Sequence, residues 1–140
     1  KRYHALTWGA PKEDEGTIDR PIGRASSKNG PPRWSAQPGA RGTQRDAITH
    51  WRVLARGDTV CLLELEPKTG RTHQLRVHLK AIHHPIVCDR LYAPGQGCLP
   101  GLDRVALHAL RLEFTDLAGA SRSFEASYPT DLSQVMGAIV

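Results

Sequence analysis

The stretch Pro67-Lys-Thr-Gly-Arg-Thr-His-Gln-Leu-Arg-Val-His-Leu79 decides how this chain is organised, because it joins a strand-like segment to a helix-like one. The pattern predicts an α-helix from Arg71 to about Ile82. Within it, Leu75, Leu79 and Ile82 recur at i, i+4 and i+7 and form an apolar stripe. We therefore expect one face of this helix to pack on the core of the domain.

The ends of the predicted helix carry start and stop signals. Thr69 or Thr72 would cap the exposed amide groups, and Pro85 would prevent continuation. The residues of the polar face are Arg71, Gln74 and His78. Arg76 lies at the border of the apolar stripe, where its guanidinium could pair with a carboxylate from another segment or simply lie over apolar surface. Helix position alone leaves both interpretations open.

Short strands surround this helix in the sequence. Segments of strand character are 1–8, 47–55, 59–65, 105–114 and 121–126. Gly57-Asp58 suits a two-residue hairpin turn with glycine first, and Ala118-Gly119 suits a second hairpin. By contrast, eight of the 22 residues from Pro21 to Gly42 are glycine or proline, which predicts a long loop.

Positive charge is concentrated in two segments of the chain. The net charge is +5 with a pI of about 9.5. The segment between Arg20 and Trp51 contains one acidic residue, Asp46, and six basic ones, which are Arg20, Arg24, Lys28, Arg33, Arg41 and Arg45. Between Pro67 and Tyr92 the bases are Lys68, Arg71, Arg76, Lys80 and Arg90. Segregated positive charge suits a polyanion, although charge alone is equally consistent with a solvated surface.

The composition argues against a disulfide-rich, a metal-binding or a membrane-spanning protein. The cysteine count is three with no C-x-x-C pair, which argues against a disulfide framework or a zinc site and mildly favours a reducing compartment. The five-residue steps between His73, His78 and His83 would make these side chains diverge on a helix, so we expect no metal site. No apolar run approaches the roughly 20 residues of a membrane span.

The stretch Pro67–Leu79 resembles, together with the segment His84-Pro-Ile-Val-Cys-Asp-Arg-Leu-Tyr92, the signature of RNA pseudouridine synthases of the RluA type. Weaker landmarks follow in the family's order: Lys1-Arg-Tyr-His-Ala5, Asp19-Arg-Pro-Ile-Gly-Arg24, Ala47-Ile-Thr49, Leu107-His-Ala109 and Phe124-Glu-Ala-Ser-Tyr-Pro129. The resemblance implies an α+β fold with a mixed, largely antiparallel sheet and one main helix. It makes residues 1–140 the C-terminal part of a catalytic domain, with 21–45 as a variable basic loop.

The resemblance also implies a reaction. Such enzymes isomerise uridine to pseudouridine in structured RNA, ribosomal or transfer, without a metal or organic cofactor. The N1–C1′ bond breaks and C5 bonds to C1′, with an aspartate of a His-Arg-Leu-Asp-x-x-Thr-Ser-Gly motif acting on the sugar. None of the aspartates of this chain lies in such a motif, so we expect the nucleophile upstream and the fragment alone to be inactive. The alternative is a non-catalytic RNA-binding module or a decayed paralogue.

The resemblance assigns roles to individual residues. Tyr3 falls on the tyrosine that packs against the target base, and Arg76 falls on the arginine that pairs with the catalytic aspartate. We therefore expect both side chains to line one cleft. The residues expected to bind RNA are Arg71, His73 and Gln74 at the helix start and Arg24, Arg33 and Arg41 in the loop. A helix start with basic side chains suits phosphate.

Two positions depart from the family pattern. His83 and Cys88 stand where the family usually has glycine, which predicts a local backbone adjustment. The expected partner is structured RNA, with no membrane and no small-molecule cofactor. We expect a monomer in the cytoplasm, or in an organelle if the source is eukaryotic.

Overall fold

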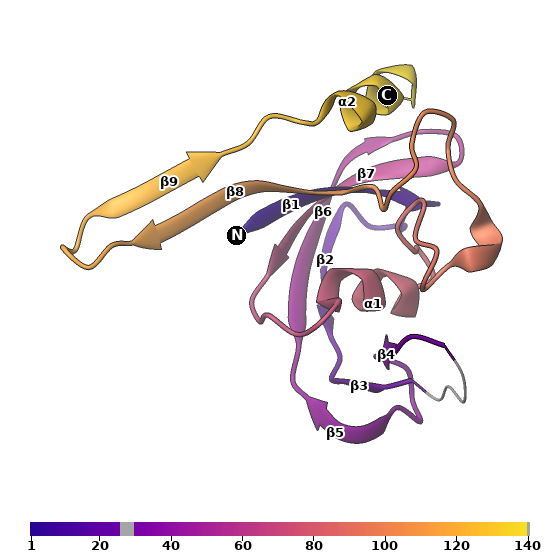
Figure 1. The fold of residues 1–140 in the computed structure, drawn as a ribbon, viewed down its shortest axis with the longest axis horizontal. Coiled ribbons are helices and arrows are strands. Elements are labelled where there is room, and N and C mark those ends of the chain that lie inside the picture. Colours follow the sequence, from indigo (N-terminus) through magenta and orange to yellow (C-terminus); the bar gives the residue numbers. More distant parts are fainter. Residues whose placement is uncertain (26–29, 140) are drawn as a thin grey trace.

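A six-stranded antiparallel sheet forms the centre of the protein. The computed structural model describes residues 1–25 and 30–139 (Figure 1). The strand order in the large sheet is β2-β6-β7-β1-β8-β9, with neighbouring strands antiparallel. The bounds are β1 Arg2–Trp8, β2 Glu15–Asp19, β6 Ile48–Arg56, β7 Val60–Pro67, β8 Leu107–Thr115 and β9 Ser121–Glu125. Figure 1 shows the β8–β9 hairpin extending away from the rest of the fold.

The expected strands and hairpins are present, with one turn displaced. The hairpin between β6 and β7 is closed by the N–H of Gly57 donating to the carbonyl of Val60 at 2.8 Å, so its two central residues are Asp58 and Thr59. The prediction of a turn with Gly57 in the first central position is therefore wrong by one residue. The second hairpin turns at Gly119, whose φ of 84° suits glycine.

Helix α1 (Gln74–Ala81) is buried on two faces. Leu75 and Leu79 belong to the main core with strand residues such as Leu63, and Leu79 and Leu63 are fully buried. Each leucine buried in this way contributes about 1.5–3 kcal/mol. Val77 and Ala81, on the opposite side of the helix, belong to a second apolar cluster. The helix therefore lies between the large sheet and a smaller unit and fixes their relative position.

The smaller unit corrects the expectation of a long loop over residues 21–42. Its three antiparallel strands lie in the order β4-β3-β5, with bounds β3 Ile22–Arg24, β4 Trp34–Ser35 and β5 Arg41–Arg45. Ile22 and Ala36 are buried against Val77, Ala81 and Tyr92, which gives this glycine- and proline-rich segment an apolar anchor. Lys28, one of the predicted cations, lies outside the described residues.

The start of α1 lies three residues later than the sequence predicts. His73 is the N-cap residue, in a left-handed conformation with φ 54° and ψ 24°, and it makes no side-chain capping hydrogen bond. Neither predicted threonine caps the helix. Instead, the side-chain oxygen of Gln74 accepts from the backbone N–H of Arg71 at 3.1 Å and from the hydroxyl of Thr69 at 2.6 Å. These bonds hold the turn that leads from β7 into α1.

The end of α1 places His83 in a left-handed conformation, which glycine adopts most easily. The N–H of His83 donates to the carbonyl of Lys80 at 3.0 Å, and the N–H of His84 donates to that of Leu79 at 2.9 Å. This pattern is a Schellman motif, in which the residue after the C-cap is left-handed. His83 has a φ of 68° and Cys88 has a φ of 65°, so both residues adopt the conformation that favours glycine. Each position thus combines a side chain with a backbone conformation that glycine favours, and the expected backbone adjustment stays a prediction.

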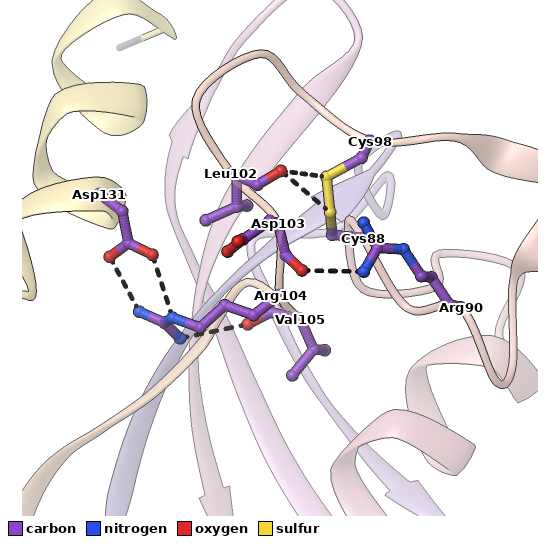
Figure 2. Close-up of a disulfide and its surroundings, with 8 residues drawn as sticks. All are labelled: Cys88, Arg90, Cys98, Leu102, Asp103, Arg104, Val105 and Asp131. Carbon is purple, nitrogen blue, oxygen red and sulfur yellow. Dashed lines mark hydrogen bonds and ion pairs between the residues drawn. A yellow bond between two sulfur atoms is a disulfide. The ribbon is translucent and has the colours of Figure 1, made fainter.

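The segment between α1 and β8 contains a disulfide, contrary to the sequence analysis. Cys88 and Cys98 are bonded to each other across a sequence separation of 10, around the short helix η1 (Pro94–Gln96) (Figure 2). Both sulfur atoms lie against the carbonyl oxygen of Leu102, at 3.5 and 2.8 Å. Cys61 is buried and free. The cysteine pattern therefore gives no support for a reducing compartment.

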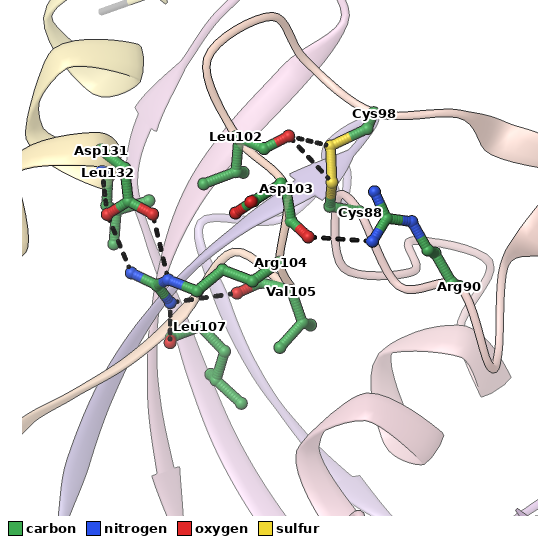
Figure 3. Close-up of polar contacts among 10 residues, drawn as sticks. All are labelled: Cys88, Arg90, Cys98, Leu102, Asp103, Arg104, Val105, Leu107, Asp131 and Leu132. Carbon is green, nitrogen blue, oxygen red and sulfur yellow. Dashed lines mark hydrogen bonds and ion pairs between the residues drawn. A yellow bond between two sulfur atoms is a disulfide. The ribbon is translucent and has the colours of Figure 1, made fainter.

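The same segment is tied to the C-terminal helix α2 (Thr130–Ile139). Arg104 donates from Nε and Nη2 to the two carboxylate oxygens of Asp131, both at 3.1 Å, and from Nη1 to the carbonyls of Val105 and Leu107 (Figure 3). Leu132 is fully buried in the main core. These contacts fix the path of the chain into β8.

Candidate functional site

A groove of about 330 Å³ forms where β1, the end of β7 and the start of α1 meet. It is lined by Lys1, Tyr3, Pro67, Thr69, Gly70, Arg71, His73, Gln74, Leu75, Arg76 and Leu107. Tyr3 and Arg76 are therefore in one groove although they lie far apart in the sequence. The three helix-start residues expected to bind RNA line the same groove. We call it the β1–α1 groove.

Tyr3 is held on a strand in the interior of the sheet. It lies opposite Leu65 of β7 and Ala109 of β8, so its backbone is paired on both sides. Its side chain is half-buried and packs against the main core. A tyrosine fixed in this way keeps an amphipathic ring at the groove surface at little cost in conformational entropy. Such a ring could receive a nucleobase.

Arg76 is fixed by a bidentate ion pair with Asp89. Its Nε donates to Oδ2 at 2.9 Å and its Nη2 donates to Oδ1 at 2.7 Å. The side chain of Asp89 has no exposed surface, whereas 20% of the Arg76 side chain remains exposed. The guanidinium carbon lies 5.0 Å from the centre of the Tyr92 ring. The border arginine therefore pairs with a carboxylate from another segment, one of the two interpretations that the sequence left open.

The pair with Asp89 uses only one side of the Arg76 guanidinium. The fork of Nε and Nη2 is occupied by Asp89, and within the described residues Nη1 has no hydrogen-bond partner. Since a guanidinium carries five N–H donors, it can serve a second anion without releasing Asp89. Arg76 is thus rigidly placed and still able to bind a negative group in the β1–α1 groove.

The electrostatics of the pair favour the charged forms. Burial alone would raise the pKa of Asp89, but hydrogen bonds from Arg76 and from the N–H groups of Tyr92 and Leu91 outweigh burial, so the pKa is lowered. The hydrogen bond with Asp89 raises the pKa of Arg76. Burial is also the main reason that the pKa of Tyr92 is raised. Arg76 therefore remains a cation, and Asp89 remains an anion, at every physiological pH.

Gln74 and His78 are structural rather than exposed. The amide nitrogen of Gln74 donates to the carbonyl of Ile48 at 2.9 Å and to the hydroxyl of Thr49 at 3.0 Å. Nδ1 of His78 lies 2.8 Å from that hydroxyl, and Nε2 lies 2.9 Å from the carbonyl of Arg20. Gln74 and His78 do share a polar face, because both bond the hydroxyl of Thr49, but this face is buried rather than exposed to solvent. The amide oxygen and the amide nitrogen of Gln74 each make two hydrogen bonds within the protein, and its expected contact with RNA stays a prediction.

His73 and Arg71 remain on the rim of the groove. The Nδ1 atom of His73 lies 2.8 Å from the hydroxyl of Tyr92. Burial, and then the charge of Arg76, lower the pKa of His73, which favours its neutral form. Nε of Arg71 donates to the carbonyl of Asp46 at 2.8 Å. The remaining guanidinium donors of Arg71 have no partner in the described part of the chain and are available to a phosphate.

The cations of the small sheet lie outside the β1–α1 groove. Arg24 on β3 and Arg41 on β5 are register partners and are exposed. Arg33 lines a different groove, between β4 and α1. The six residues expected to bind RNA therefore form two sets, one at the helix start and one on the small sheet. Their contact with RNA stays a prediction.

Asp89, Tyr92 and Trp34 are the neighbours of the site that the sequence analysis did not assign. Asp89 and Tyr92 were within the quoted signature, and their spacing from Arg76 carried no signal of contact. Trp34 lies in the glycine- and proline-rich segment, where nothing predicted a packed aromatic. Within the described residues there is no cluster of three or more His, Cys, Asp or Glu suited to a metal ion. None of the helices there is long and apolar enough to cross a membrane.

Comparison with solved structures agrees with the α+β fold. The structure of human RNA pseudouridylate synthase domain containing 1 superposes with a TM-score of 0.77 at 32% identity, covering 91% of this chain and 53% of that one. Human RNA pseudouridylate synthase domain containing 4 superposes with a TM-score of 0.75 over 97% of this chain and 60% of that one, and its 23% identity supports the fold alone.

Sequence comparison identifies the family. The RNA pseudouridylate synthase family model matches residues 1–81. An uncharacterized RNA pseudouridine synthase of Mycobacterium bovis is 40% identical over 97% of this chain and 43% of its own length. The dual-specificity RNA pseudouridine synthase RluA of Vibrio cholerae is 36% identical over 81% of this chain and 44% of its own length. The chain belongs to the RNA pseudouridylate synthase family, and it spans less than half the length of these two relatives.

Proposed function

We propose that this chain is the C-terminal part of the catalytic domain of an enzyme that isomerises uridine to pseudouridine in structured RNA, ribosomal or transfer. The observation that carries the proposal is the meeting of Tyr3 and Arg76 in one groove. Family membership supplies the reaction, and the groove supplies a place for it. No cofactor is needed, because the reaction only exchanges one bond within the nucleotide for another.

Each groove residue has a task in this proposal. The target uridine leaves its stack, and its uracil rests against the ring of Tyr3, which offsets part of the cost of unstacking. Arg76, immobilised by Asp89 and Tyr92, holds a catalytic aspartate from outside these 140 residues in its ionised form. That aspartate acts on the sugar while N1–C1′ breaks and C5–C1′ forms. N1 gains a proton and C5 loses one, so the overall change is an isomerisation.

One observation favours a second candidate function. Since Asp89 already occupies one side of the Arg76 guanidinium, this arginine has a structural partner whether or not a catalytic aspartate is present. A non-catalytic RNA-binding module, or a decayed paralogue, would keep the same arrangement. The two candidates differ in whether pseudouridine forms.

The test uses the full-length protein and RNA transcripts labelled with tritium at C5 of uridine. Isomerisation releases that tritium to water, so release measures turnover directly. We expect the wild type to release tritium and Arg76→Lys to be slower by on the order of 100-fold, because lysine cannot hold both carboxylates in fixed geometry. Arg52→Lys is the matched control, since Arg52 pairs with Glu64 on an exposed part of the sheet.

The outcomes separate the candidates. RNA binding without tritium release by the full-length wild type would support the non-catalytic module. Full activity of Arg76→Lys, with a melting temperature equal to that of Arg52→Lys, would remove Arg76 from the mechanism.

A further inference from the structure

We propose that the groove between β4 and α1 is a second nucleotide site, which takes an RNA nucleotide close to the target uridine. Trp34 would stack on its base, and Arg33 and Lys80 would bind its phosphate. This inference rests on the proposed function for its choice of RNA as the ligand. The site is distinct from the β1–α1 groove, and we call it the β4–α1 groove.

The β4–α1 groove has a volume of about 220 Å³. One wall comes from the small sheet, with Arg33, Trp34 and Ser35, and the other comes from α1, with Val77 and Lys80. Trp34 is half-buried, so part of its indole is available at the surface. Its backbone N–H donates to the hydroxyl of Tyr92 at 3.2 Å, and its indole packs edge-on with the His73 ring at a centroid distance of 5.5 Å. An aromatic ring held in this way is suited to base stacking.

The charge of this groove suits a phosphate. Its lining contains Arg33 and Lys80 and no acidic residue. Lys80 is exposed and has no carboxylate partner within the described residues. The nearby carboxylate of Asp89 is fully buried and bonded to Arg76, so it does not neutralise the groove. A base with an anionic phosphate therefore matches the lining better than a neutral or cationic ligand does.

The two grooves are neighbours, because a ring that lines one contacts a ring that lines the other, and a neighbouring nucleotide is therefore the expected occupant. His73 lines the β1–α1 groove, and Trp34 lines the β4–α1 groove. The His73 ring lies edge-on to Trp34 and to Tyr92, with centroid distances of 5.5 Å in both cases. The guanidinium carbon of Arg76 lies over the Tyr92 ring, 5.0 Å from its centre. An RNA strand that places a uridine at Tyr3 would therefore pass Arg71 and His73 and reach Trp34.

The test measures RNA binding by the full-length protein at several salt concentrations. We expect Lys80→Gln to weaken binding several-fold and to reduce the slope of log K against log salt by about 0.7, the value for one phosphate on a single strand. Trp34→Leu should weaken binding roughly 5- to 100-fold, with Trp34→Phe restoring most of the loss. Lys12→Gln is the matched control, because Lys12 is an exposed lysine of the turn after β1. Quenching of tryptophan fluorescence by RNA should be lost in Trp34→Phe.

Tritium release measured on the same samples separates this inference from the proposed function. If Lys80→Gln and Trp34→Leu bind RNA as Lys12→Gln does, the second site is wrong even where turnover is normal. If these variants lose affinity while no protein releases tritium, the second site stands and the isomerase activity is wrong. If Trp34→Leu lowers the melting temperature, the affinity of Lys80→Gln for RNA decides whether the second site exists. Equal quenching by uridine monophosphate and by RNA would overturn the assignment to RNA.

Discussion

Replacing Asp89 with asparagine should strongly destabilise the protein, because Asp89 is fully buried and paired with Arg76. The carboxylate accepts four hydrogen bonds, from Nε and Nη2 of Arg76 at 2.9 and 2.7 Å and from the N–H groups of Leu91 and Tyr92 at 3.2 and 3.0 Å. Asparagine retains one acceptor oxygen and places an N–H₂ donor against the guanidinium. Breaking a buried ion pair costs about 3–5 kcal/mol. Because the partly exposed Arg76 can recover some hydration, we expect the free energy of unfolding to fall by about 3 kcal/mol, the lower end of this range.

Urea denaturation of the full-length protein measures this loss. Asp103→Asn is the matched control, because Asp103 is exposed and its backbone carbonyl, rather than its carboxylate, accepts from Arg90. The control should change the free energy of unfolding by less than about 0.5 kcal/mol. If Asp89→Asn destabilised the protein no more than the control, the bidentate pair would not be what holds Arg76.

The pH dependence of stability gives a second check on the same residue. Burial raises the pKa of Asp89 in the folded protein, but the hydrogen bond from Arg76 and the other favourable contacts outweigh burial, so this pKa is lower than its ordinary value. Its stabilisation is therefore fully present above its unfolded pKa of about 3.9 and is lost as the pH falls through the folded pKa. Asp89→Asn should flatten the acid limb of the stability curve, which the control should leave unchanged.

His83→Gly should raise the free energy of unfolding by about 0.5–1 kcal/mol in thermal melts, because glycine adopts the left-handed C′ conformation without strain; a fall would contradict the assigned Schellman motif. Cys98→Ser should lower stability by about 2–3 kcal/mol under oxidising conditions and by much less with reductant present, and equal losses would exclude the disulfide. Burial lowers the pKa of His78, so its contribution to stability is complete above about pH 6.5 and decreases as the pH falls; an NMR titration with an ordinary pKa would contradict its burial. Replacing Arg24, Arg33 and Arg41 with glutamate should lower the affinity for RNA and flatten its salt dependence. An unchanged slope would show that these three arginines do not contact RNA phosphates.

The sequence predicted those features of the fold that rest on local periodicity. Leu75 and Leu79 marked the core face of α1 because their spacing follows the helical repeat, and Gly119 marked a hairpin by its conformational freedom. The start of α1 was not predicted, since it depends on Gln74 bonding to Arg71 and Thr69 within a turn. A general preference of threonine for capping could not reveal that arrangement.

Features that depend on contacts between distant segments were predicted only where the family resemblance supplied them. Composition gave no reason for Tyr3 and Arg76 to meet, and the resemblance did. The resemblance did not supply Asp89 as the partner of Arg76, because its emphasis fell on an aspartate outside the chain. The small sheet was missed because glycine and proline dominate its composition, while its stability comes from Ile22 and Ala36 packing on the far side of α1.

The central claim is that the target uracil rests against Tyr3 in the β1–α1 groove. Photo-crosslinking tests it most directly, with full-length protein bound to an RNA that carries 5-iodouridine at the modified position. We expect the crosslinked peptide to contain Tyr3, and we expect Tyr3→Leu to abolish the crosslink. A crosslink at Trp34 with none at Tyr3, or one that survives Tyr3→Leu unchanged, would contradict it.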